Sequence, residues 1–342
     1  MYKKIYLSVI LGVLFFISCK DKKQYYEESG TVFHTLYTIK YEAPYALTDK
    51  IDAELQKFNL SLNPFNPNSI IAKVNNNEAV EVDEWFTEVF NKSMEVSRNS
   101  DGVFDITCAP LVNLWGFGFN KKDSVTPTMI DSLKTFVGYQ KVHLEGKKIV
   151  KDDPRLLLNC SAIAKGYSCD VIARLLEKDG VENYMVLIGG EVVVKGVNQN
   201  GVCWRTGINL PEDDPDGIKN NYDEIVQLCK KGAIATSGNY RNFYIKDGKK
   251  YAHTINPRTG YPAEQSVLSA TIVANDCMTA DAYATAFMAM GLEKARQMAD
   301  TLPEIEYYVI YADESGKHQI EFSKGMLQYL PKRKTMISSD NS

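Results

Sequence analysis

The chain has 342 residues, of which 44% are hydrophobic and 24% are charged, and its formal net charge at pH 7 is −4. This length and apolar content suit one large domain or two closely joined ones. The acidic balance argues against a nucleic-acid partner, because such proteins usually present a basic face. The cysteines form neither the close pairs of a zinc site nor a dense disulfide framework.

The first eighteen residues differ in pattern from the rest of the chain. Lys3 and Lys4 precede an apolar run that ends at Ile17, which is too short to span a membrane comfortably and predicts a secretory signal over 1–18. Cys19 directly follows a sequence that resembles a bacterial lipoprotein box, which implies cleavage before Cys19 and attachment of lipid to it. An uncleaved anchor is the alternative. Either arrangement places the rest of the chain outside the inner membrane.

Loss of the signal removes two lysines and no acid, which takes the formal net charge from −4 to −6. Six further cysteines lie mostly in apolar surroundings, which favours buried thiols, although export would permit a disulfide. They are Cys108, Cys160, Cys169, Cys203, Cys229 and Cys277.

The first half of the mature chain mixes β-rich and helical patterns. Residues 19–29 are charged without periodicity and predict a tether. Apolar spacing and β-branched content then predict a strand, two amphipathic helices and, between the helices, a loop rich in proline and asparagine. The strand is at 31–41, the helices at 48–59 and 83–97, and the loop at 63–69.

The second half shows the same mixture and ends in a frayed tail. We predict a short helix, a hairpin and a strand that leads into a helix near Ser161, then strands on both sides of Gly189-Gly190, two more strands around a polar insertion, and two helices before a closing hairpin. The short helix is at 126–138, the hairpin at 139–158 and the strand at 156–159. The strands around the glycine pair lie within 184–197, and the two further strands, at 202–210 and 224–228, flank the polar insertion at 212–221. The two helices are at 279–290 and 293–302, the closing hairpin is at 307–311 with 319–322, and the tail is at 334–342. Without strict strand-helix alternation, the pattern indicates an α+β or mixed α/β domain over 30–333.

Two oxygens on the predicted helix at 279–290 suggest a metal site. Residues four apart lie on one helix face, so the Asp281 carboxylate and the Thr285 hydroxyl can converge on one point. Hard oxygens of this kind suit Mg²⁺, which a carboxylate commonly holds together with substrate phosphates. The structural alternative is equally simple, because an early Asp offsets the helix dipole and a Thr often bonds back to the preceding turn.

Three further features fit an anionic substrate. Residues 235–241 place Gly and Asn at a turn whose amides can face an anion. His253, which can exchange a proton near neutral pH, lies close to an Asn-Pro turn and to Arg258. Lys165, at the start of a helix that follows a strand, could neutralise a pyrophosphate, although a solvated lysine is the simpler interpretation. Together these residues suggest phosphoryl chemistry.

Five blocks, in order, resemble the ApbE family of FAD:protein FMN transferases, and the likeness runs from Gly30 past Gly291. The blocks are SDGVFDITCAPLVNLWGFG (100–118), SAIAKGYSCDVIARLLEKDGVENYMVLIGGEVVVKG (161–196), ATSGNYRN (235–242), AHTINPRTGYP (252–262) and TADAYATAFMAMG (279–291). The resemblance implies an ApbE-like fold with the flavin site between two halves of one catalytic region.

The resemblance also assigns site residues. It implies metal binding by the Ala162 carbonyl, Asp281 and Thr285, and catalysis by His253 and Asp281. The implied flavin contacts are Phe33, Phe65, Val103, Phe104, Asp105, Asn159, Lys165 and Ile255. Three of these depart from the family pattern: Phe65 replaces a tyrosine, Phe33 replaces a residue that is often methionine, and Asn159 replaces an aspartate and so lacks its charge.

The implied activity is Mg²⁺-dependent transfer of FMN from FAD, the substrate, to a Thr or Ser hydroxyl of a target protein, with release of AMP. His253 would take the hydroxyl proton or orient the acceptor. Two rivals stay open: an FAD pyrophosphatase, in which water attacks, and a flavin-binding lipoprotein without catalysis. The expected location is the bacterial cell envelope, with a lipid on Cys19 holding the protein on the outer side of the inner membrane or in the outer membrane.

Overall fold

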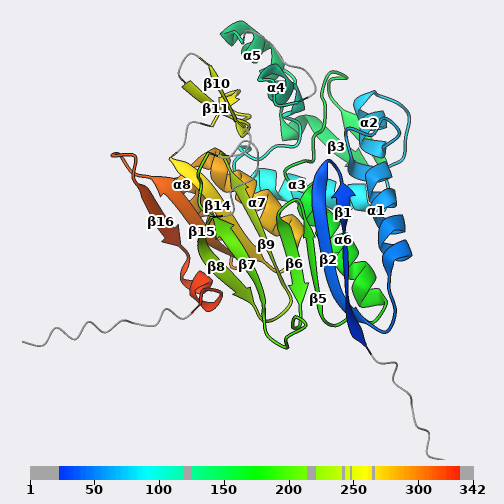
Figure 1. Ribbon diagram of the computed structural model, residues 1–342. Helices are drawn as coiled ribbons and strands as arrows, with labels where there is room; N and C mark the ends of the chain where they lie inside the picture. Colours follow the sequence, from blue (N-terminus) through cyan, green and yellow to red (C-terminus); the bar gives the residue numbers. More distant parts are fainter. Residues whose placement is uncertain are drawn as a thin grey trace, which may run out of the picture.

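An eight-stranded antiparallel sheet forms the centre of the molecule (Figure 1). The computed structural model describes residues 23–118, 125–213, 221–240, 243–246, 249–263 and 266–331. The strands lie in the order β1-β2-β5-β6-β9-β14-β15-β16. Their bounds are Gln24–Val32, Thr35–Ala43, Tyr184–Ile188, Glu191–Lys195, Gly232–Gly238, Val267–Ala274, Ile305–Ala312 and His318–Phe322.

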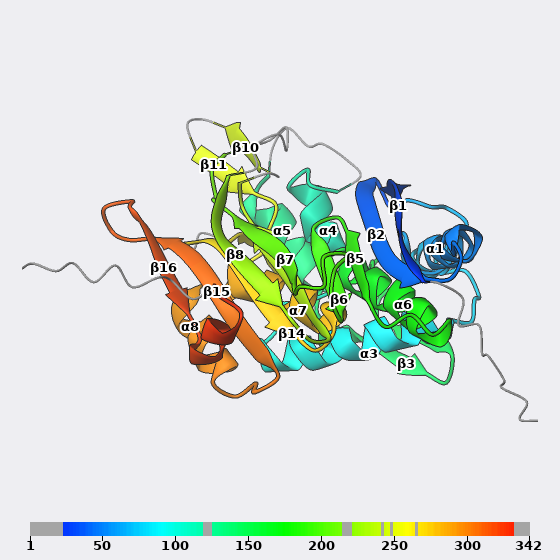
Figure 2. The same ribbon diagram turned by 60° about the horizontal axis from the view of Figure 1, so that its bottom comes forward.

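Helices cover one face of this sheet and a β-hairpin covers the other (Figure 2). Helices α6 (Ala164–Lys178), α7 (Cys277–Met290) and α8 (Leu292–Ala299) pack on the sheet, and α1 (Thr48–Leu62) and α3 (Glu84–Asn99) pack on α6 and α7. Helix α2 (Ile70–Asn75) packs on α1, whereas α4 (Ala109–Leu114) and α5 (Pro127–Lys134) pack together beyond one end of the sheet (Figure 1). Side chains alternate between the faces, as expected for strands buried on both sides. On β15, Val309 packs in the core on the helical side, whereas Tyr308 and Ile310 pack on the hairpin side. The predicted α+β class is therefore confirmed.

The hairpin on the second face consists of β7 (Trp204–Asn209) and β8 (Tyr222–Leu228). Trp204 and Val226 are buried against the sheet there. A disulfide joins Cys203, just before β7, to Cys229, just after β8. The prediction of unpaired thiols was wrong for these two residues, because cross-strand pairing brings together cysteines 26 positions apart. The prediction of buried thiols is confirmed for Cys160, Cys169 and Cys277, whereas Cys108 is half-buried.

The N-terminal hairpin corrects two predictions. Strand β1 begins at Gln24, so residues 24–29 belong to the sheet and not to a tether. The strand predicted over 31–41 is broken by a two-residue turn at Phe33 and His34, whose φ angles are 50° and 59°. Such a turn normally carries Gly or Asn, so Phe and His at these positions do not indicate it.

The strand predicted over 156–159 is also absent. Only an isolated bridge joins Leu157 to Cys108. The backbone of Leu158 instead bonds with the Asn75 side chain, whose Oδ1 accepts from the Leu158 N–H at 2.7 Å and whose Nδ2 donates to the Leu158 carbonyl at 2.9 Å. A side chain thus takes the place of a neighbouring strand.

The remaining predictions of helices and strands hold with shifts of a few residues. The predicted hairpin at 139–158 is shorter and consists of β3 (Val142–Glu145) and β4 (Lys148–Lys151), after a 3₁₀ turn at Tyr139–Lys141. A second 3₁₀ turn occupies Lys324–Gln328, and small ladders are formed by β10 (Phe243–Lys246) with β11 (Lys249–Ala252) and by β12 (Ile255–Asn256) with β13 (Tyr261–Pro262). The predicted signal, most of the polar insertion and the C-terminal tail lie outside the described residues. Within the described ranges, no helix is both long and apolar enough to cross a membrane.

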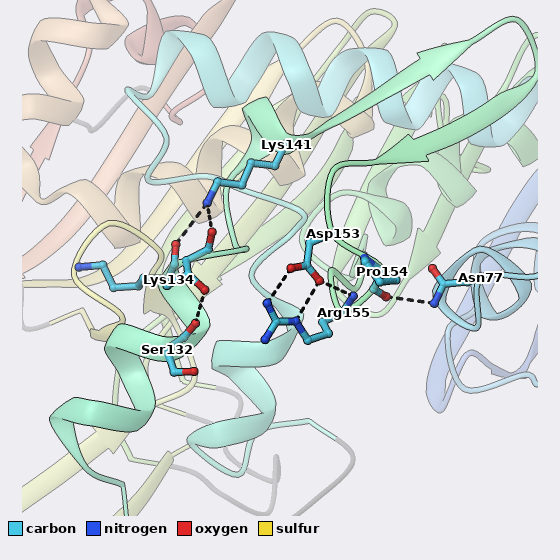
Figure 3. A network of polar contacts seen from close by, with 8 residues as sticks. Asn77, Ser132, Lys134, Lys141, Asp153, Pro154 and Arg155 are labelled. Atoms are coloured by element: carbon cyan, nitrogen blue, oxygen red, sulfur yellow. Dashed lines mark hydrogen bonds and ion pairs between the residues drawn. The ribbon is translucent and has the colours of Figure 1, made fainter.

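Polar contacts hold the segment that leads to Asn159 (Figure 3). Arg155 donates to Asp153 from Nε at 3.0 Å and from a terminal nitrogen at 2.7 Å, and its guanidinium lies 4.4 Å above the Phe136 ring. On the other side, the Asn77 amide donates to the Pro154 carbonyl at 3.0 Å. These contacts fix the loop between β4 and Asn159.

Candidate functional site

A cavity of about 380 Å³ lies where α4, the start of α6, the end of β9 and the middle of α7 meet. Its lining comes from both halves of the chain, as the family resemblance implies. The structure brings together eleven of the twelve predicted site residues in this lining: Phe65, Val103, Phe104, Asp105, Asn159, Ala162, Lys165, His253, Ile255, Asp281 and Thr285. Cavities of this size commonly hold small molecules and cofactors.

Phe33 is the exception. It is not part of the cavity lining, and its ring packs against Phe58 of α1 at a centroid distance of 5.1 Å. The next residue, His34, instead approaches the cavity wall, with its ring 5.5 Å from that of Phe65 in an edge-to-face arrangement. The predicted contact of Phe33 with the flavin therefore does not appear in this arrangement.

Helix α7 supplies the two predicted side-chain ligands from within the core. Asp276 caps it, with the side chain accepting a hydrogen bond from the Thr279 N–H at 2.8 Å, and Gly291 ends it. Every residue of α7 is buried except Thr285, which is half-buried. A helix that is apolar all round is a core helix, so the Asp281 carboxylate, only 3% exposed, stands out as a buried charge that lines the cavity.

Three charged groups lie together beside the cavity. Lys165 forms an ion pair with Glu191, which is 3% exposed and follows the Gly189-Gly190 turn. Burial raises the pKa of Asp281, against the opposing effects of Lys165 and of the Gly166 N–H. Burial alone would lower the pKa of Lys165, but the carboxylates of Glu191 and Asp281 raise it above its ordinary value. Lys165 is therefore a cation held at the cavity by an ion pair.

The oxygens near Asp281 are of the kind that holds Mg²⁺. The Thr285 hydroxyl lies 3.2 Å from the Ser237 hydroxyl, and both residues line the cavity with Asp281 and Ala162. Among the described residues there is no group of three or more His, Cys, Asp or Glu side chains that could hold a metal. One carboxylate with neutral oxygens suits Mg²⁺, which keeps several waters and shares substrate phosphates, better than it suits zinc.

Aromatic rings form another part of the wall. Phe65 is 53% exposed and lines the cavity, where an aromatic ligand could stack on it. After α4, the Phe117 ring stacks on that of Tyr244 on β10 at a centroid distance of 5.2 Å and lies 6.4 Å from the His253 ring. His253 is thus placed at the cavity between β11 and β12, next to an aromatic cluster.

Two polar residues of the lining also bond to the backbone near them. Asp105 accepts hydrogen bonds from the Thr107 N–H at 2.7 Å and from the Tyr139 N–H at 2.8 Å. Burial raises the pKa of Asp105 to about 6, although these hydrogen bonds oppose the shift. Asn159 Oδ1 accepts from the Ser161 N–H at 2.8 Å, which shapes the turn before α6. Both side chains therefore organise the cavity wall itself.

The sequence predictions missed Glu191 and Ser237. Glu191 opens the apolar strand β6, and a lone acid beside three valines was a usable signal of a buried charge. Ser237 lies in the block 235–242, which was interpreted only as a turn that presents amides to an anion. Its side-chain contact with Thr285 joins residues 48 positions apart and could not be seen locally.

Fold and site together define an α+β protein with a cavity lined by an exposed aromatic ring, a lysine and a buried carboxylate. The ApbE family model matches residues 33–309, and the chain belongs to the ApbE family. The FAD:protein FMN transferase of Vibrio cholerae is 35% identical over 323 residues, which cover 91% of this chain and 95% of that protein. The enzyme of the same name from Escherichia coli is 31% identical over 314 residues, which cover 85% of this chain and 88% of that protein.

Solved structures agree with this assignment. The flavin transferase ApbE from Vibrio cholerae superimposes with a TM-score of 0.80 at 33% identity, covering 90% of this chain and 100% of that one. The apo form of the flavinyl transferase ApbE from Pseudomonas stutzeri gives a TM-score of 0.79 at 26% identity, with 90% and 97% coverage. The predicted ApbE-like fold is confirmed.

Proposed function

We propose that this protein transfers FMN from FAD to a Thr or Ser hydroxyl of a target protein, with Mg²⁺ as cofactor and AMP as the leaving group. Transfer of FMN from FAD to a protein follows from membership in the ApbE family and from the relatives named FAD:protein FMN transferase at 35% and 31% identity. The observation that carries the finer proposal is one cavity that Asp281, Thr285, Lys165 and His253 all line.

In the proposed reaction, the acceptor oxygen bonds to the phosphorus of the FMN moiety while the bond from that phosphorus to the oxygen of AMP breaks. His253 takes the proton of the attacking hydroxyl or orients it. Lys165 faces the negative charge of the pyrophosphate, and Phe65 offers a surface for the flavin ring. When bound to Asp281, Thr285 and the Ala162 carbonyl, Mg²⁺ would stabilise the charge that develops on the leaving AMP.

We also propose that the protein works in the cell envelope, anchored by a lipid on Cys19 after removal of residues 1–18. The basic start, the apolar run and the position of Cys19 support this location. The Cys203–Cys229 disulfide is consistent with it, because disulfides persist in oxidising compartments. The acceptor would then be an exported or membrane-bound redox protein.

The test incubates the protein with FAD, Mg²⁺ and a candidate acceptor, followed by denaturing electrophoresis. Flavin fluorescence on the denatured acceptor supports the proposal, and an acceptor with its Thr replaced by Val serves as the matched control. Release of FMN and AMP without labelling would replace the transferase by a pyrophosphatase. Intact FAD in the presence of Mg²⁺ would leave only a flavin-binding role.

A further inference from the structure

The proposed metal ligands come from two different elements, and the contact between these elements is unusually close. Ala162 lies just before α6, whereas Asp281 and Thr285 lie on α7. The two helices pack together on the helical face of the sheet (Figure 2). Gly166 of α6 faces α7, where a Cβ atom would lie 2.2 Å from the Cys277 carbonyl oxygen and 2.7 Å from the Asp281 Cβ. Only glycine permits this approach.

Two sets of hydrogen bonds join α6 to α7 across this contact. The Gly166 N–H donates to Asp281 Oδ2 at 2.9 Å. One turn further along α6, Asp170 accepts from the Cys277 N–H at 2.9 Å and from the Met278 N–H at 2.8 Å. These two amides belong to the first turn of α7, where no helical carbonyl is available to accept from them. Asp170, 6% exposed, therefore fixes the start of α7 while Gly166 fixes the Asp281 carboxylate.

We propose that Gly166 and Asp170 are positioning residues that set the spacing between the Ala162 carbonyl and the Asp281 carboxylate, and thereby the affinity for Mg²⁺. The inference rests on the proposed metal site. Mg²⁺ demands near-ideal octahedral geometry with short bonds to oxygen, so a small shift of α7 against α6 misplaces a ligand. Residues that orient metal ligands typically change metal affinity by about 10- to 100-fold when they are replaced.

Asp276 provides a matched control on the same helix. Its side chain accepts from the Thr279 N–H at 2.8 Å, so it caps α7 from within α7's own N-terminus. Asp276→Ala removes the cap of α7 and Asp170→Asn removes one of the two acceptor oxygens at the start of α7, but only Asp170 lies on α6. A difference between these variants in metal affinity separates positioning from simple helix capping.

The experiment measures Mn²⁺ binding to the full-length protein by electron paramagnetic resonance, with Mg²⁺ as competitor, together with thermal unfolding and FMN transfer. We expect Asp170→Asn to weaken Mn²⁺ binding by about tenfold or more. The Mg²⁺ concentration for half-maximal transfer should rise in parallel, and saturating Mg²⁺ should restore most of the rate. Asp276→Ala should lower the unfolding midpoint and leave Mn²⁺ affinity unchanged. Gly166→Ala should resemble Asp170→Asn where it folds.

Equal Mn²⁺ affinity in Asp170→Asn and wild type would overturn the inference. A wild type that binds no Mn²⁺ would overturn it together with the proposed metal site. If wild type binds Mn²⁺ and Asp170→Asn binds it weakly, but neither transfers FMN, the positioning role stands and the proposed function fails.

Discussion

Asp281 is the residue at which the needs of folding and of catalysis conflict most. A buried carboxylate is costly unless it is paired, and the raised pKa of Asp281 is the sign of that cost. Lys165 and the Gly166 N–H compensate only in part. A side chain kept in this position at a cost to stability is expected to serve the chemistry of the cavity.

Replacement of this residue should separate stability from activity. In Asp281→Asn the amide oxygen can still accept from the Gly166 N–H, while the buried charge is removed. We expect an unfolding midpoint that is unchanged or higher. FMN transfer should fall by about a hundredfold or more, because a metal ligand supplies several kcal/mol of transition-state stabilisation. Thermal unfolding and the acceptor-labelling assay measure the two effects, and an active variant would remove Asp281 from the proposed metal site.

His34 carries strain of a different kind, because its φ of 59° lies in the left-handed region that favours glycine. Relief of this strain by His34→Gly should stabilise the protein by about 1 kcal/mol. Phe33→Gly is the matched control, since its φ of 50° is equally strained but its ring packs on Phe58. Phe33→Gly should therefore be less stable than wild type. Urea unfolding measures both, and a less stable His34→Gly would contradict the interpretation.

Among the helices and strands, those with local signals could be predicted from the sequence. Helix α3 has amphipathic apolar spacing and α7 is an unbroken apolar run, and an Asp caps each of them, Asp83 and Asp276. The turn at Phe33-His34 was missed because its residues are atypical of turns, and the strand at 156–159 was predicted wrongly because Asn75 replaced the missing neighbour. In each failure a distant or strained contact decided the structure.

The contacts of the site also divide into those that a local sequence signal predicts and those that it does not. Asp281 and Thr285 converge by helical spacing alone, so the sequence was sufficient to pair them. Glu191 meets Lys165 across 26 positions, and Asp170 meets Cys277 across 107. No local pattern contains these contacts, because only the packing of α6 against β6 and α7 creates them.

Asp105 joins the segment before α4 to the 3₁₀ turn at Tyr139 by a hydrogen bond. Its contribution to the free energy of unfolding should depend on pH. Its pKa is raised from 3.8 to about 6, so the folded protein binds the proton more tightly than the unfolded chain. The stability from this proton is therefore full below about pH 4 and is lost as pH rises through about 6. The loss amounts to about 3 kcal/mol.

Urea unfolding of wild type and Asp105→Asn at several pH values isolates this contribution. The free energy of unfolding of wild type should fall relative to that of the variant between about pH 4 and 6 and stay level above this range. The difference between the two proteins cancels the other titrating groups. A difference that does not vary with pH would show that the Asp105 pKa is not raised.

For the molecule as a whole, the sheet sets the distance between the start of β1 and the cavity. Strand β1 has nine residues and therefore spans about 30 Å, from Gln24 to the turn at which His34 touches Phe65. With Cys19 lipidated as proposed, only residues 20–23 separate the lipid from β1. We therefore expect the cavity to face away from the bilayer, toward a domain of the acceptor that projects from the membrane.

The Cys203–Cys229 disulfide joins the two ends of the β7–β8 hairpin. It closes a loop across 26 positions, and loop-closure entropy predicts a stabilisation of about 3.5 kcal/mol. The other cysteines within the described residues are unpaired thiols, so among them a reductant has only this bond to break. We expect dithiothreitol to lower the urea midpoint of wild type and to leave a Cys203→Ser, Cys229→Ser double variant unchanged. Because the hairpin packs on the face of the sheet opposite the cavity, FMN transfer at low temperature should survive reduction. An equal midpoint with and without reductant would mean that the bond does not stabilise the folded state, and the support it lends to an exported location would be lost.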